Sequence, residues 1–107
     1  MPLKSTRWDV SEFLDSHDAI AAYLNAAFEE GDPAFIAASI GRVAKAKGMS
    51  QIARETGLSR ESLYRALSDD GNPELSTMTK VMRALGMRIQ IAPAARVRPA
   101  RRKRAAA

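Results

Sequence analysis

The sequence of 107 residues contains no cysteine, a single histidine and few aromatic side chains. Without thiols, a disulfide framework and thiolate metal sites are excluded, and a reducing cytoplasm fits this composition. No apolar run approaches the roughly 18 residues of a membrane-spanning helix, and residues 1–10 lack the apolar core of a secretory signal. We therefore expect a soluble, cytoplasmic protein built as one small domain.

Motifs for catalysis and for cofactor binding are also missing. With no second imidazole and no cysteine nearby in sequence, His17 is more typical of a helix start than of a metal ligand or a catalytic base. No serine lies in a glycine elbow, and no glycine-rich phosphate loop is present. The sequence therefore predicts no enzyme, no cofactor and no metal site.

The net charge of +5 is distributed unevenly along the chain. Residues 1–35 carry two basic and seven acidic side chains, whereas residues 36–93 carry nine basic and five acidic ones. The last 14 residues carry six bases and no acid: Arg96, Arg98, Arg101, Arg102, Lys103 and Arg104. A basic segment suits phosphate and an acidic one suits a basic partner, so two different partners are indicated, although charged faces are most often only solvated.

Capping residues and apolar periodicity predict an all-α bundle of five to six helices. With their caps, the helices are expected at residues 9–14, 16–31, 32–48, 50–57, 59–68 and 76–86, with Ser50 capping the fourth and Ser59 the fifth. The buried positions of the second and third helices are expected to be Ile20, Tyr23, Leu24, Ala27, Phe28, Phe35, Ile36, Ile40, Val43 and Ala44.

After the last helix, Met87, Ile89 and Ile91 alternate with Arg88 and Gln90, which is the period of a strand with one apolar face. A single strand has no partner within this chain, so pairing with its own copy in an isologous dimer is one expectation. The alternative is an extended segment that packs its apolar face on the helices. No apolar pattern follows, so the predicted domain covers residues 1–93 and residues 94–107 form a disordered basic tail.

The helix expected at residues 60–68 has two chemically different faces. On a wheel of about 100° per residue, one arc of roughly 140° holds Arg60, Glu61, Tyr64, Arg65 and Ser68. The other arc holds Ser59, Ser62, Leu63, Ala66 and Leu67. Because a short helix and a glycine turn precede it, this helix has the place of the recognition helix in a helix-turn-helix motif.

This placement predicts which side chains contact DNA. Arg60, Glu61 and Arg65 are expected to read base edges, since arginine can address guanine O6 and N7 together and glutamate can accept from a cytosine amine. The DNA backbone is expected to contact Gln51, Ser59, Tyr64 and Ser68. An ordinary solvated helix face is the competing interpretation. The basic tail would add nonspecific affinity for phosphate, fold on a partner, or remain solvated without a role.

The runs MSQIARETGLSRESLYRAL and GNPELSTMTKVMRALGMRI resemble the helix-turn-helix of the Cro/repressor superfamily. Together with the upstream run WDVSEFLDSHDAIAAYLNAAFEEGDPAFIAASIGRVAKAKG, they are similar to the addiction-module antidote proteins, antitoxins that accompany a RelE/ParE-like toxin. The similarity covers about residues 8–91 and leaves out the basic tail. It implies a protein that neutralises a toxin by binding it and that represses its own operon as a dimer on operator DNA.

The acidic front of the chain is the expected toxin contact, because toxins of that class act on RNA or related polyanions and tend to be basic. The candidates are Trp8, Asp9, Glu12, Asp15 and Asp18. Phe13 and Tyr23 are further candidates, for which packing in the core is the competing interpretation. Two other functions stay open: a stand-alone Cro/repressor-type regulator, and a helix-turn-helix module that docks protein or RNA.

Overall fold

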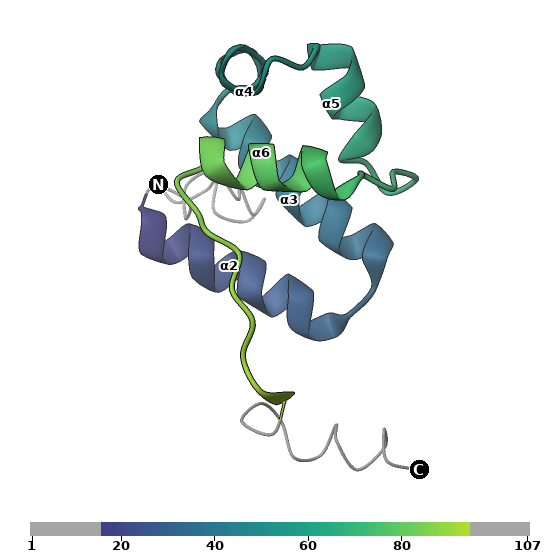
Figure 1. Cartoon of the computed structure of the whole chain (residues 1–107). Coiled ribbons are helices and arrows are strands. Elements are labelled where there is room, and N and C mark those ends of the chain that lie inside the picture. The colour runs from purple at the N-terminus through teal and green to yellow at the C-terminus, as the bar shows by residue number, and fades with distance from the viewer. Residues whose placement is uncertain (1–15, 95–107) are drawn as a thin grey trace, which may run out of the picture.

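The computed structural model describes residues 16–94 of the chain, and this part is all-helical, without a β-strand. Its five helices are α2 (His17–Glu30), α3 (Pro33–Lys47), α4 (Met49–Thr56), α5 (Arg60–Ala66) and α6 (Leu75–Ala84) (Figure 1). The helix predicted at residues 9–14 lies outside the described residues.

The predicted boundaries of α2 are confirmed, and so are those of α3. The Ser16 hydroxyl accepts the backbone N–H of Ala19 at 3.1 Å, and Gly31 ends α2 in the left-handed region at φ 77°. Asp32 then caps α3, and Pro33 is its first residue, where proline's missing N–H costs no hydrogen bond. Short-range chemistry therefore determines where both helices begin and end.

The start of α4 differs from the prediction that Ser50 caps it. Gly48, at φ 115°, is the only residue between α3 and α4. Its N–H closes the end of α3 by donating to Ala44 and Lys45, while its carbonyl accepts from Gln51 and Ile52. Ser50 is therefore already the second residue of α4, because one glycine serves both helices and leaves no place for a side-chain cap.

Two other boundaries also shift by a residue or two. The last helix, α6, begins at Leu75 rather than at Ser76 or Thr77, and Glu74 precedes it without a side-chain cap. The fifth, α5, ends at Ala66 rather than at Ser68, with Leu67 as its C-cap. The predicted stop at Gly86 follows directly after Leu85, at φ 78°.

The helices form one continuous core. In it, α2 packs on α3, α3 packs on α4 and α5, and α4 packs on α5 and α6. The buried cluster comprises Ile20, Leu24, Ile40, Val43, Ala44, Met49, Ile52, Leu63, Leu67, Val81, Met82 and Leu85. As Figure 1 shows, α4 and α5 lie at one end of the molecule and α2 at the other.

Two aromatic residues predicted to be buried are exposed. Phe28 is 42% exposed and Phe35 is 40% exposed, whereas Ile20, Leu24 and Ala27 on α2 are buried. Phe28 lies about 80° around the helix wheel from Ile20, on the flank of α2 that borders the segment after α6. Phe35 lies in the first turn of α3, ahead of the buried run that begins at Ala37. Both phenylalanines therefore lie at the edge of the buried stripe.

Gly41 sets how closely α5 approaches α3. A Cβ atom on Gly41 would collide with the carbonyl oxygen of Leu67 and would lie 3.2 Å from the Leu67 Cβ. No residue with a side chain fits there without moving the end of α5. The glycine therefore fixes the position of the helix that carries the predicted base-reading residues.

The expected strand at Met87, Ile89 and Ile91 is not formed in the described chain. These residues continue after α6 as a non-helical segment that runs past α2 and away from α4 and α5 (Figure 1). Met87 is half-buried against the core, whereas Ile89 is 49% exposed and Ile91 is 96% exposed. The alternative of packing on the helices therefore holds for Met87 alone. Pairing with a second copy stays a prediction.

Candidate functional site

The connection between α4 and α5 consists of Gly57, Leu58 and Ser59. Gly57 adopts the left-handed conformation at φ 80°, which reverses the chain at the end of α4. The Thr56 hydroxyl accepts the N–H of Leu58 at 3.2 Å and donates to the Ile52 carbonyl at 2.8 Å. The Thr56 hydroxyl at the end of α4 therefore anchors the turn through hydrogen bonds. The turn has the three-residue length found in helix-turn-helix motifs.

The start of α5 is fixed by Ser59. Its hydroxyl accepts the backbone N–H of Ser62 at 3.0 Å, which is the hydrogen bond of an N-cap. The same hydroxyl lies 2.9 Å from the Ser62 hydroxyl. In Figure 1, α4 is seen along its axis while α5 runs across the view, so the two helices cross steeply. The first turn of α5 therefore projects at one end of the molecule.

The predicted base-reading residues lie together on the outer face of α5. Arg60, Glu61 and Arg65 are exposed, and Tyr64 is 42% exposed between them. The Arg60 guanidinium carbon lies 5.8 Å from the centre of the Tyr64 ring, within the range of a cation–π contact. Leu63 and Leu67 are buried on the opposite side. The predicted division of α5 into a polar and an apolar face is confirmed for these side chains; their role on DNA stays a prediction.

Most of the side chains predicted to contact the DNA backbone form hydrogen bonds within the protein. Gln51 donates its side-chain N–H to the Glu55 carboxylate at 3.0 Å, and the Ser68 hydroxyl donates to the Arg65 carbonyl at 3.0 Å. Ser62, predicted on the inner arc, is exposed because it lies at the rim between the two faces. Of the predicted backbone contacts, Tyr64 is thus the one whose polar group has no hydrogen bond among the described residues.

A hollow between α3 and α5 brings together charges that the sequence analysis did not connect. Arg42 and Lys45 of α3 line it together with Tyr64, Asp69 and Asp70. Arg42 also donates to the Tyr23 hydroxyl at 3.3 Å. Because cations and carboxylates share the hollow, it does not favour an anion or a cation alone. The sequence contains one signal for this hollow, because Arg42 and Lys45 lie three residues apart and therefore share an exposed face of α3.

Replacing Ser59 by alanine is expected to lower stability by about 0.5–2 kcal/mol, the usual cost of losing an N-cap. For a domain of this size that is a decrease in melting temperature of several degrees, measurable by circular dichroism. Ser59→Asp is the matched control, because a carboxylate accepts the same N–H and suits the positive end of the helix dipole. Equal melting temperatures for Ser59→Ala and wild type would contradict the cap's energetic role.

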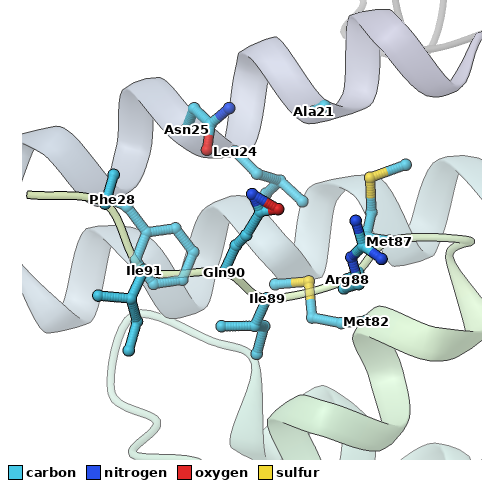
Figure 2. A pocket seen from close by; sticks show the side chains of 11 residues that line it. Ala21, Leu24, Asn25, Phe28, Met82, Met87, Arg88, Ile89, Gln90 and Ile91 are labelled. Atoms are coloured by element: carbon cyan, nitrogen blue, oxygen red, sulfur yellow. The ribbon is translucent and has the colours of Figure 1, made fainter.

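A second hollow, of about 520 Å³, lies between α2 and the segment after α6. Figure 2 shows Ile91 beside Phe28 and Met87 near Ala21, so the segment runs along α2 in the same direction as the helix. Leu24 and Met82 form part of its apolar lining. We call this hollow the α2 groove. Helical periodicity does not predict this groove, because its position depends on where residues 87–92 lie relative to α2.

The predicted toxin contacts fall mostly outside the described residues. Trp8, Asp9, Glu12 and Asp15 lie there, as do Phe13 and the basic tail. Asp18 is described and is exposed in the first turn of α2, a helix that carries three acidic side chains and no lysine or arginine. Tyr23 is half-buried against the core, as its competing interpretation expects.

Within residues 16–94, no cluster of histidine, cysteine, aspartate or glutamate suitable for a metal ion is found. His17 lies at the first position of α2 with its ring against Gly86. None of the helices in this part of the chain is long and apolar enough to cross a membrane.

Taken together, these features define a small helical protein that presents the polar face of a short helix behind a glycine turn. The chain belongs to a family described as "Probable addiction module antidote protein", whose sequence model matches residues 4–93. It is 46% identical over 84 residues to an uncharacterized protein of Haemophilus influenzae, an alignment that covers 78% of this chain and 87% of the relative. No solved structure matches it significantly.

Proposed function

We propose that the protein is an antitoxin that neutralises a RelE/ParE-like toxin by binding it and represses its own operon by binding operator DNA as a homodimer. The observation that carries the DNA-binding part is the outer face of α5, where Arg60, Glu61, Tyr64 and Arg65 stand exposed behind a three-residue turn. Membership of an antidote family supports the toxin-binding part. Both are binding activities rather than catalysis, and an operator places them in the cytoplasm.

On DNA, α5 enters the major groove with its N-terminal turn foremost, as recognition helices do. Arg60 and Arg65 address guanines, and Glu61 accepts from a cytosine amine or orients a neighbouring arginine. Tyr64 contacts a phosphate or a thymine methyl group. The Cro/repressor type of helix-turn-helix fits this arrangement, because α4 crosses α5 steeply and packs against it.

Toxin binding falls to the acidic front of the chain, which continues through α2. The helix α2 itself carries Asp18, Glu29 and Glu30 and no lysine or arginine. Charges of this sign suit a basic toxin and speed its encounter with the antitoxin. Because α2 lies at the opposite end of the molecule from α4 and α5 (Figure 1), a toxin bound there leaves the outer face of α5 accessible.

In this proposal residues 1–93 form the folded domain, and residues 87–91 join two copies. Two copies present two recognition helices to the two half-sites of an operator, which a single copy cannot do. The tail from residue 94 onward carries six bases and acts as a clamp on phosphate, adding affinity that falls steeply with salt.

Two other functions are carried forward as alternatives. A stand-alone regulator of the Cro/repressor type would use the same face of α5 without any toxin. A module that docks protein or RNA would use this face without DNA.

One experiment separates the three functions. In the first measurement, the full chain is mixed at moderate salt with its own promoter fragment and with a shuffled duplex of equal length. In the second, the product of the neighbouring gene is expressed in cells with and without this chain, and growth is followed. Selective binding of the promoter together with rescue of growth supports the antitoxin. Selective binding without any toxic neighbour supports the stand-alone regulator, and no promoter binding favours the protein or RNA module.

A further inference from the structure

A third hollow, of about 420 Å³, lies where α6 meets the segment that follows it. Three apolar side chains, two arginines and one threonine line it: Met82, Met87, Ile89, Arg83, Arg88 and Thr79. Figure 2 shows Ile89 turned toward Met82 of α6 rather than toward α2. We call this hollow the α6 hollow, and we call its apolar side chains the floor.

The positive charge of the α6 hollow has no counterpart close by. Arg83 and Arg88 are exposed, and neither side chain forms a hydrogen bond or an ion pair within residues 16–94. Glu74 is the last acidic residue of the chain, and no carboxylate lines the hollow. The hollow therefore favours an occupant that is acidic and that also brings apolar side chains to the floor.

The first described residues of the chain lie beside this hollow. The start of α2 and the end of α6 are on the same side of the molecule (Figure 1), and a Cβ atom on Gly86 would lie 2.9 Å from Nε2 of His17. Gly86 is between the two arginines in sequence, so the chain that precedes α2 is attached close to them. Eight residues span about 26–29 Å when extended and about 12 Å as a helix. Residues 8–15 are thus long enough to enter the hollow in either form.

Residues 8–15 carry the chemistry that the α6 hollow lacks. Their sequence is WDVSEFLD, with three carboxylates and no base. In the helix predicted there, Val10, Phe13 and Leu14 share an arc of roughly 100°, and Asp9 lies about 40° beyond its edge. Apolar side chains and a carboxylate therefore fall on neighbouring parts of one surface. An aromatic ring also packs favourably on the sulfur of methionine, which the floor supplies.

We propose that residues 8–15 dock in the α6 hollow of their own chain. Phe13 and Leu14 then pack on the floor, and the carboxylates face the two arginines. A short tether holds this segment at a high effective concentration, which favours it over a separate partner of the same chemistry. Pairing of two copies through residues 87–91 would use the backbone edge of that segment and would leave its side chains available to the docked residues.

Docking has a consequence for toxin binding, and this consequence alone rests on the proposed function. Asp9, Glu12 and Asp15 are expected toxin contacts, so in the free protein they are held against the two arginines. A toxin has to displace residues 8–15 before it reaches these carboxylates, and the displacement uncovers the α6 hollow. The docked segment is therefore an autoinhibitory contact that the toxin releases.

The fluorescence of Trp8 reports on this segment directly, because it is the only tryptophan of the chain. Quenching by acrylamide, which is uncharged, is measured on the full chain and on a synthetic peptide of residues 1–15. We expect the wild type to be quenched less than the peptide. Ile89→Asp is expected to raise quenching to the level of the peptide, because it places a carboxylate in the floor. Leu75→Asp, exposed on α6 outside the hollow, is the control that stays protected.

A charge swap separates the ionic contacts from a general loss of folding. Arg83→Glu with Arg88→Glu is expected to expose the tryptophan to acrylamide. Asp9→Lys with Glu12→Lys is expected to do the same. All four changes together are expected to restore protection, because opposite charges face each other again. Arg54→Glu, on α4 outside the hollow, is the control for a change of charge alone.

Paired cysteines test the position of the segment in a chain that has no cysteine of its own. Phe13→Cys with Ile89→Cys is expected to form a disulfide within one chain on mild oxidation, because the two side chains are in contact when the segment is docked. The product runs as a monomer on a non-reducing gel. Phe13→Cys with Asn25→Cys, which lies in the α2 groove, is the matched control and is expected to remain unlinked.

Equal quenching of the wild type and the peptide would overturn the inference, and so would protection that survives Ile89→Asp. A disulfide of Phe13→Cys with Ile89→Cys that forms only between two chains would assign the hollow to a second copy instead. A disulfide with Asn25→Cys would place the segment in the α2 groove. Promoter binding and rescue of growth are measured independently of these results, so a failure of docking is distinguishable from a failure of the proposed function.

Discussion

Replacing Arg60 and Arg65 together by alanine is expected to abolish selectivity for the promoter while leaving the fold intact. Both side chains are exposed on α5, and neither belongs to the buried core. Each arginine that addresses a guanine contributes about 1–3 kcal/mol of discrimination, which is a factor of about 5 to 150 per contact. Fluorescence anisotropy with the promoter fragment and with a shuffled duplex measures the ratio of the two affinities.

The matched control keeps the charge and removes the planar fork. Arg60→Lys with Arg65→Lys retains two cations, so binding to any duplex should keep its salt dependence, but the flexible ammonium of lysine lacks the rigid planar fork of arginine. We expect this variant to keep its affinity for shuffled DNA and to show a smaller ratio of promoter to shuffled affinity than the wild type. If the double alanine variant kept the wild-type ratio of affinities, the assignment of α5 as the recognition helix would be wrong.

The features predicted best from the sequence are those determined within a few residues. Ser16, Gly31, Gly57 and Ser59 cap or end helices as expected, because each acts on backbone groups no more than three or four positions away. The inward face of α5 follows from helical periodicity in the same way, with Leu63 and Leu67 buried. Such features need no knowledge of the tertiary fold.

The errors arise where one group serves two elements or where a distant segment intervenes. Gly48 ends α3 and begins α4 at once, which made Ser50 look like a cap although it lies inside the helix. Phe28 fits the apolar stripe of α2 by spacing, yet it borders a segment about 60 residues later in the chain and stays exposed. Periodicity within a helix does not tell which side a later segment will cover.

For the candidate site, the sequence indicated the helix and its outer residues but not their surroundings. The hollow that joins Arg42 and Lys45 to Tyr64 depends on how closely α5 approaches α3. Gly41 permits this approach, because a side chain at its position would collide with Leu67. The α2 groove likewise depends on the path of residues 87–92. Both are products of tertiary packing.

Leu63→Ala is expected to produce the largest loss of stability and, through it, of DNA binding. Leu63 is fully buried and belongs to the core cluster that holds α5 against its neighbours. Truncating a buried leucine costs about 2–5 kcal/mol, compared with a total stability of about 5–15 kcal/mol for a typical domain. Urea denaturation followed by circular dichroism should show a much lower midpoint with a similar slope.

Leu75→Ala makes the same chemical change at a site that is 72% exposed on α6, and surface changes of this kind usually stay within about 0.5 kcal/mol. The contrast between the two leucines tests whether α5 is anchored as its faces indicate. At a temperature where Leu63→Ala is still folded it should bind the promoter with wild-type selectivity, because Arg60, Glu61 and Arg65 are unchanged; a folded variant without selectivity would mean that Leu63 also sets the orientation of α5 on DNA.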